Sequence, residues 1–164
     1  MKTERPSPEQ RAFNSTFVSL YREIHNQLQH EVSNLGEALT WVPGPDTNSI
    51  STLVVHLLGS EAEVLRVVRG LPSDRDRPAE FTANVMDAEE LVRRIVATDR
   101  LLEELGPQIT EEDLMTSRVR PSALSNEPGS GLYWLLNSYG HAREHLAQLQ
   151  LTKQLFLMQS QPGP

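Results

Sequence analysis

Apolar residues recur at steps of three and four over most of the chain. The first such series predicts a long amphipathic helix from about Pro8 to Ala38, begun by Ser7 as N-cap with Pro8 in the first turn. Its apolar positions are Phe13, Phe17, Tyr21, Ile24, Leu28, Val32, Leu35 and Leu39.

Three further segments repeat this pattern, each bounded by helix-capping or helix-stopping residues. They predict helices from about Ser49 to Arg69, from Asp87 to Leu105 and from Gly131 to Met158. No segment alternates with a period of two, which would indicate a strand. The chain is therefore predicted to be an all-α four-helix bundle. We expect a single domain over residues 1–164, with flexible ends at about 1–6 and 159–164.

Two connections between the predicted helices are long. The charged stretch from Pro72 to Val85 is predicted to be a solvated connection. The stretch from Pro107 to Gly129 shows one short helical signal, at Thr110–Asp113, and is predicted to be either a lid over a binding site or a crossing connection. Arg118 and Arg120 within it would meet an anionic substrate under the first interpretation and would be ordinary exposed arginines under the second.

Composition narrows the classes of function. The chain has no cysteine, which excludes disulfides, thiolate metal sites and a cysteine nucleophile. Its formal net charge is −7 and no run of Lys and Arg is long enough to follow a phosphate backbone, so nucleic-acid binding is disfavoured. The N-terminus lacks the apolar core of a signal peptide, and no apolar run reaches the length of a membrane span. We expect a cytoplasmic protein with no membrane partner.

The candidate chemistry centres on histidine. His141 and His145 lie one turn apart on one face of the last predicted helix, where two imidazoles can reach the same metal ion. His56 takes the matching border position in the second helix. Three imidazoles plus water make an open site that suits zinc, nickel, iron or cobalt. The alternative is that these histidines merely flank a packing stripe. His25 and His30 are predicted to be surface or boundary residues.

Two further residues are candidates for supporting roles. Glu61 falls near the centre of the apolar face of its helix, where a carboxylate is costly unless it is paired. Gln148 follows His145 on the same border. Either could orient an imidazole, and Glu61 could also serve as a general base. Further candidates for orienting an imidazole are Ser60, Asn137 and Glu144.

Two groups of residues together resemble a known family. They are Trp41…Pro43…Asn48-Ser49-Ile50…Leu53-Val54-Val55-His56-Leu57…Glu61 and His141-Ala142-Arg143-Glu144-His145-Leu146-Ala147-Gln148. With the order of the helices they resemble the DinB-like (damage-inducible) superfamily over most of the chain. The resemblance implies a DinB/YfiT-like bundle, up-down-down-up or related, that forms a homodimer. It also implies a divalent metal ion, zinc or nickel before iron or cobalt, held by His56, His141 and His145.

The family contains bacillithiol transferases and mycothiol-dependent maleylpyruvate isomerases. Three hypotheses follow for this chain. The first is a metal-dependent S-transferase that acts on a small-molecule substrate with an external low-molecular-weight thiol. The second is a metal-dependent hydrolase in which Glu61 or another carboxylate activates water. The third is a non-catalytic metal-binding or interaction protein, in which the site only holds the bundle together or is a relic.

Overall fold

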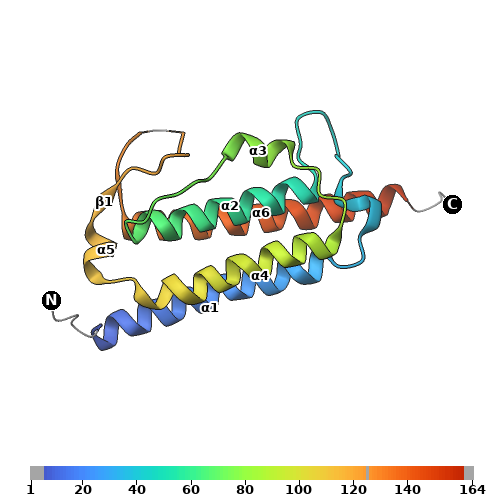
Figure 1. Cartoon of the computed structure of the whole chain (residues 1–164). Helices are drawn as coiled ribbons and strands as arrows, with labels where there is room; N and C mark the ends of the chain where they lie inside the picture. Colours follow the sequence, from blue (N-terminus) through green and yellow to red (C-terminus); the bar gives the residue numbers. More distant parts are fainter. Residues whose placement is uncertain (1–5, 125, 161–164) are drawn as a thin grey trace.

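The computed structural model describes residues 6–124 and 126–160. Four long helices form the bundle, and two of them run in each direction, in the order up-down-down-up (Figure 1). They are α1 (Pro8–Val32), α2 (Ile50–Val68), α4 (Ala88–Leu105) and α6 (Gly131–Gln159). The predicted all-α four-helix bundle is confirmed. Of the predicted flexible ends, residues 1–5 and 161–164 lie outside the described residues.

The four helices pack in a ring. Helix α2 packs against α4 and α6, and α1 packs against the same two helices, so that α1 and α2 lie on opposite corners. The periodic apolar positions meet along the axis. The largest fully buried side chains are Tyr21, Ile24, Leu28, Leu39, Ile50, Leu57, Leu65, Leu91, Ile95, Leu102, Ile109 and Leu135. In the described part of the chain, no helix has the length and apolar character needed to cross a membrane.

Helix α1 is shorter than predicted. It ends at Val32, and a 3-10 turn η1 (Gly36–Leu39) carries Leu39, the last apolar residue of the series. Asn34 and Gly36 adopt positive φ angles of 62° and 53°, which a continuing helix does not allow. Leu39 is still fully buried, so a periodic apolar pattern can outlast the helix that it begins in.

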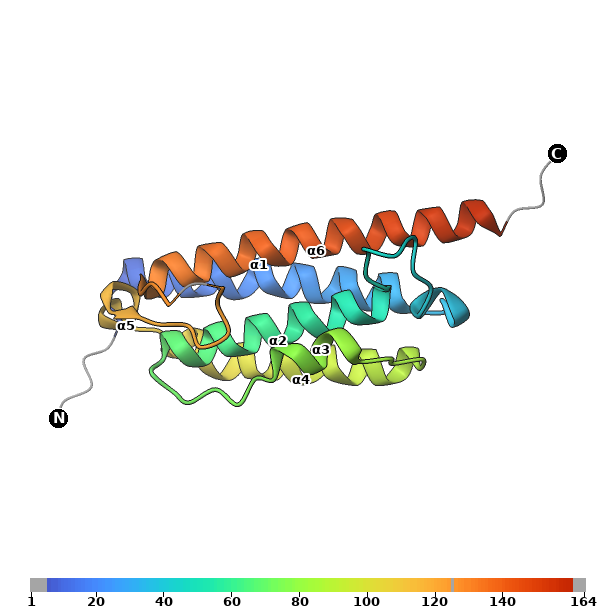
Figure 2. The ribbon, with the colours of Figure 1, turned by 90° about the horizontal axis from the view of Figure 1, so that it is seen from above.

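The connection from α2 to α4 has to travel the length of the bundle. These two helices run in the same direction, so the chain must return to its starting end before α4 can begin. The returning segment lies along α2 and contains a short helix, α3 (Arg77–Thr82) (Figures 1 and 2). The prediction of a solvated connection is wrong here, because Arg75 and Glu80 have side chains only 5% and 8% exposed.

The connection from α4 to α6 closes one end of the bundle (Figure 1). The helical signal at Thr110–Asp113 is confirmed by α5, which Thr110 begins with a capping box to Asp113. Two-residue strands pair antiparallel, Ser117 with Ser130 and Arg118 with Gly129, so a minimal sheet exists where none was predicted. The short elements are η2 (Gly106–Gln108), α5 (Glu111–Met115), β1 (Ser117–Arg118) and β2 (Gly129–Ser130).

Candidate metal centre

Three histidines from two helices converge on one point. His56 comes from α2, and His141 and His145 come from consecutive turns of α6, which packs against α2. One ring nitrogen of each lies within 4.8 Å of the other two. The Nε2 atom of His141 is 3.2 Å from Nε2 of His56 and 2.9 Å from Nε2 of His145.

The opposite ring nitrogens of two of these histidines are anchored. Nδ1 of His56 is 2.8 Å from Oε2 of Glu80, and Nδ1 of His145 is 2.8 Å from Oε1 of Gln148. Both partners are acceptors, and Glu80 is closer to Nδ1 of His56 than the donor Nη2 of Arg75, which lies 3.3 Å away. Each Nδ1 therefore carries the proton, and each Nε2 presents a lone pair to the centre. Three converging nitrogens cannot all satisfy one another with hydrogen bonds when two of them have no proton to donate.

This donor set fits a divalent ion. Ligands of tetrahedral zinc at about 2.0–2.1 Å stand about 3.3 Å apart, close to the nitrogen spacing of this cluster. The electrostatics agree. Burial, followed by the neighbouring His145 and His56, lowers the pKa of His141 to about 3. Burial also lowers the pKa of His145. Both imidazoles are therefore neutral near pH 7, which is the form that binds metal.

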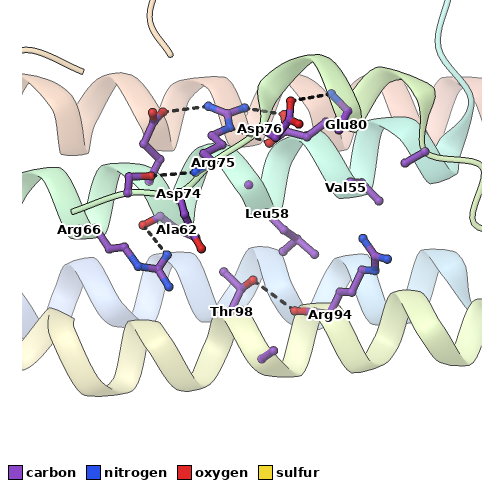
Figure 3. A pocket seen from close by; sticks show the side chains of 16 residues that line it. Val55, Leu58, Ala62, Arg66, Asp74, Arg75, Asp76, Glu80, Arg94 and Thr98 are labelled. Carbon is purple, nitrogen blue, oxygen red and sulfur yellow. Dashed lines mark hydrogen bonds and ion pairs between the residues drawn. The ribbon is translucent and has the colours of Figure 1, made fainter. Parts of the chain in front are cut away.

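An arginine–carboxylate pair holds His56 in place. Arg75 donates from Nε to Oε1 of Glu80 at 2.6 Å and from Nη2 to Oε2 at 2.7 Å, so the pair is bidentate. Burial alone raises the pKa of Glu80, but hydrogen bonds from Arg75 and His56 outweigh it and keep the pKa below its ordinary value. The carboxylate therefore remains an acceptor for Nδ1 of His56. Arg75 and Glu80 form part of the wall of a cavity of about 440 Å³ between α2 and α4 (Figure 3).

Gly59 makes room for this pair on the surface of α2. A Cβ atom at this position would stand 2.0 Å from Oε1 of Glu80 and 3.4 Å from Nε of Arg75. Glycine costs about 1 kcal/mol in a helix interior relative to alanine. Here it allows the carboxylate of α3 to approach the helix that carries His56.

A second set of charges ties the other long connection to the same face of α2. Arg120 donates to Glu63 at 2.6 Å and to Ser60 at 2.7 Å, and Ser122 donates to Glu63 through both its backbone and its hydroxyl. Arg75 also reaches Glu63, at 3.0 Å. The alternative that Arg120 is an ordinary exposed arginine is wrong, since it is buried in this network. Arg118 pairs instead with Asp113.

A cavity of about 360 Å³ opens beside the histidines. His56 and His141 form part of its wall, and Trp134 and Asn137 of α6 line it as well. The remaining lining residues are Ser60, Arg75, Arg77, Arg120, Ser122, Ala123, Leu124 and Tyr133. No carboxylate of residues 6–124 and 126–160 is among them. The volume suits a small molecule, because ligand sites typically measure about 300–1,000 Å³.

Glu61 contacts a different histidine. Its Oε2 atom lies 2.9 Å from Nε2 of His25, and Nδ1 of His25 lies 2.9 Å from Asp99 of α4. Among the described residues, Glu61 makes no hydrogen bond to the three converging histidines and does not line the cavity beside them. The prediction of His25 as a surface or boundary residue is wrong, because it is only 1% exposed. Of the two supporting candidates, the structure thus brings Gln148 to the cluster and leaves Glu61 in the bundle core.

Sequence reasoning missed Arg75 and Glu80 as supporting residues. One signal was available: Asp76 followed by Pro78 is a helix start, and Asp76 does cap α3 by accepting from the backbone of Ala79. That signal would have replaced a solvated loop by a short helix. It would not have shown which face of α3 meets His56.

Fold and site together define a helical bundle with an open three-histidine group that could bind a divalent metal ion. Comparison with known proteins gives the family. The family model of the DinB superfamily matches residues 20–149, and the chain belongs to this superfamily. Among solved structures, the chain is similar to a DinB-like protein, YjoA, from Bacillus subtilis, with 19% identity and a TM-score of 0.62. That match covers 91% of this chain and 96% of the other. No curated protein sequence matches significantly.

Proposed function

We propose that the protein is a divalent-metal-dependent S-transferase that joins a small-molecule thiol to an electrophilic substrate. The observation that carries the proposal is the convergence of three imidazoles beside a cavity that contains no carboxylate among its described lining residues. His56, His141 and His145 would hold the ion, with zinc or nickel preferred to iron or cobalt. The chemistry that the ion would supply is to lower the pKa of the thiol.

The residues of the chain prepare the site for that chemistry. Glu80 and Gln148 fix the orientation of two imidazoles through Nδ1. Trp134, which is buried, and the more exposed Tyr133 provide aromatic surface in the cavity wall. With no cysteine in the chain, the thiol has to come from outside.

The cavity lining favours transfer over the hydrolase alternative. A hydrolase needs a general base within hydrogen-bonding reach of its water. The carboxylates closest to the site through hydrogen bonds are Glu80 and Glu63. Burial acts to raise the pKa of both, but hydrogen bonds from Arg75 and His56 at Glu80, and from Ser122, Arg120 and Arg75 at Glu63, outweigh it and lower both pKa values. A carboxylate of lowered pKa that is already bonded to arginine is a weak base. The cavity also argues against a purely structural ion, which is normally enclosed by four protein ligands.

The test is a thiol-transfer assay on metal-stripped protein reloaded with zinc, nickel or cobalt. With 2-mercaptoethanol and 1-chloro-2,4-dinitrobenzene, the sulfur forms a bond to the ring carbon, chloride leaves with the electron pair and the thiol proton goes to water. We expect metal-dependent turnover that His141→Ala abolishes and His30→Ala, at an exposed histidine, retains. Hydrolysis of an ester panel without added thiol would instead support the hydrolase.

A homodimer is part of the proposal. Helix α6 exposes several apolar side chains along its C-terminal half, among them Leu151, Leu155, Leu157 and Met158. Such a strip is typical of a surface that packs against another chain. Light scattering on the eluted protein should give twice the mass of the chain, and Leu151→Glu should reduce it. We also expect the protein to act in the cytoplasm, where small thiols are kept reduced.

A further inference from the structure

The cavity beside the three histidines contains three arginines, and two of them are neutralised. Arg75 is bonded to Glu80 and Glu63, and Arg120 is bonded to Glu63. Two guanidinium groups and two carboxylates therefore cancel within this buried network. The third arginine, Arg77 of α3, makes no ion pair with any carboxylate in residues 6–124 and 126–160. One positive charge is left at the cavity of a chain whose net charge is −7.

Arg77 is held in position by an aromatic ring. Its guanidinium carbon lies 5.3 Å from the centre of the Phe81 ring, one turn further along α3. The Phe81 ring in turn lies 4.7 Å from the His56 ring. A cation held over an aromatic face keeps the N–H groups at its edge available for an acceptor. Phe81 therefore lies between the Arg77 guanidinium, whose N–H groups remain free to donate, and His56, a predicted metal ligand.

The charge of the cavity indicates the chemistry of its ligand. A guanidinium binds a carboxylate or a phosphate through two parallel hydrogen bonds to two charged oxygens, whereas a hydroxyl offers a single uncharged oxygen. Trp134 and Tyr133 line the same cavity and suit an apolar or planar stretch between two ends of a molecule. A ligand with a sulfur at the histidines and an anionic group at Arg77 would contact both groups in the cavity wall.

We infer that Arg77 is a specificity-determining residue that selects thiols carrying a carboxylate. The inference rests on the proposed function, since it assumes that a thiol binds at the histidines. It adds a preference among thiols and a residue responsible for that preference. Phe81 acts as a positioning residue for the Arg77 guanidinium.

The test compares two thiols on cobalt-substituted protein. The probes are 3-mercaptopropionate and 2-mercaptoethanol, which differ in a carboxylate against a hydroxyl. The readout is the sulfur-to-cobalt absorption band, titrated to give a Kd for each thiol without any turnover. We expect wild-type protein to bind 3-mercaptopropionate about tenfold more tightly than 2-mercaptoethanol, the scale of a partly exposed charge-assisted contact.

Substitutions of Arg77 test whether this residue causes the preference for 3-mercaptopropionate. Arg77→Gln should abolish the preference by weakening 3-mercaptopropionate alone, and Arg77→Lys should retain part of it because the charge remains. Arg93→Gln, at an exposed arginine of α4, is the matched control and should behave as wild type. If Arg77→Gln fails to load cobalt, Arg77→Lys and Phe81→Leu carry the test, and both should show a reduced preference.

The outcomes separate this inference from the proposed function. If both thiols give the band with equal Kd in wild-type protein, or if Arg77→Gln weakens both alike, the inference is overturned and the proposed function stands. If cobalt binds but neither thiol produces the band, the proposed function is overturned and the inference with it.

Discussion

Two clusters of ionisable residues in the same bundle contain histidine, and the charges around the histidines differ: one cluster is three histidines, and the other is His25 with two carboxylates. His56, His141 and His145 direct Nε2 atoms at one another, and no carboxylate lines the cavity beside them among the described residues. His25 directs both ring nitrogens at carboxylates, those of Glu61 and Asp99. The first arrangement could bind a metal ion, and the second favours a protonated imidazole.

The pKa values express this difference. Burial dominates at His141, where the histidine and arginine neighbours add to it, and the pKa falls to about 3. Burial also acts to lower the pKa of His25, but the hydrogen bonds and charges of Glu61 and Asp99 outweigh it and raise the pKa. Burial raises the pKa of Glu61 despite its bond to His25. The neighbours, and not burial alone, therefore set the direction in which the pKa of each histidine shifts.

Removing a converging imidazole should have the largest effect on metal binding. We expect His141→Ala to weaken zinc binding by more than about 100-fold, because only two imidazoles remain to hold the ion. Loss of a residue that only orients a ligand typically costs about 10–100-fold. Competition with a chromophoric chelator measures the affinity. His25→Ala and His30→Ala should bind zinc as wild type. An equal loss in His25→Ala would contradict the separation of the two clusters.

Removing His25 should affect stability instead. His25→Ala leaves Glu61 buried without its partner, and breaking a buried pair in this way costs about 3–5 kcal/mol. Urea unfolding of the metal-free protein measures the loss. His30→Ala, at an exposed site on the same helix, is the control and should change the free energy of unfolding by less than about 0.5 kcal/mol. A loss below about 1 kcal/mol in His25→Ala would show that Glu61 finds other compensation.

The support of His56 can be tested without touching a histidine. Gly59→Ala places a methyl group against Glu80 and should displace the Arg75–Glu80 pair from Nδ1 of His56. We expect zinc affinity to fall about 10–100-fold. Gly140→Ala is a matched control, because a Cβ at Gly140, next to His141 on α6, meets nothing within 4 Å. That control should bind zinc normally and unfold at higher urea, since alanine favours the helix. Unchanged zinc affinity in Gly59→Ala would show that the pair does not support the site.

Only part of the difference between the two clusters can be predicted from the sequence. Helical periodicity predicts which residues face the core, and it brings His56, His141 and His145 to the border of two helices that pack together. It does not identify Arg75 and Glu80, because their role depends on the return path of a connection between two parallel helices. Nor does it separate His25 from a surface histidine. That distinction requires knowing that Glu61 and Asp99 arrive from two other helices.

The pH dependence of the metal-free protein should reveal the two clusters with opposite signs. The folded pKa of His141 is depressed, so its contribution to stability is present above the unfolded pKa of about 6.5 and is lost as pH falls below it. The folded pKa of His25 is raised, so its contribution is present below about 6.5 and is lost as pH rises through the folded value. Each proton contributes a slope of up to about 1.4 kcal/mol per pH unit.

Urea unfolding between pH 5 and 9 measures the free energy of unfolding on the acid side and on the alkaline side separately. His141→Ala should flatten the loss of stability on the acid side and leave the loss on the alkaline side unchanged, because His25 is still present. If His141→Ala flattens the alkaline limb instead, the assignment of the two pKa directions is wrong.

The smallest effect is expected at the support of His145. Gln148 accepts from Nδ1 of His145 at 2.8 Å but is itself exposed, so water can replace it after truncation. Gln148→Ala should therefore weaken zinc binding by about tenfold at most, less than Gly59→Ala, whose target Glu80 is buried. Gln148→Glu restores an acceptor with a negative charge, which raises the basicity of the imidazole, and should match or exceed wild type. If Gln148→Ala costs as much as Gly59→Ala, then orientation of the ring, and not burial of its partner, determines how strongly a supporting residue acts at this site.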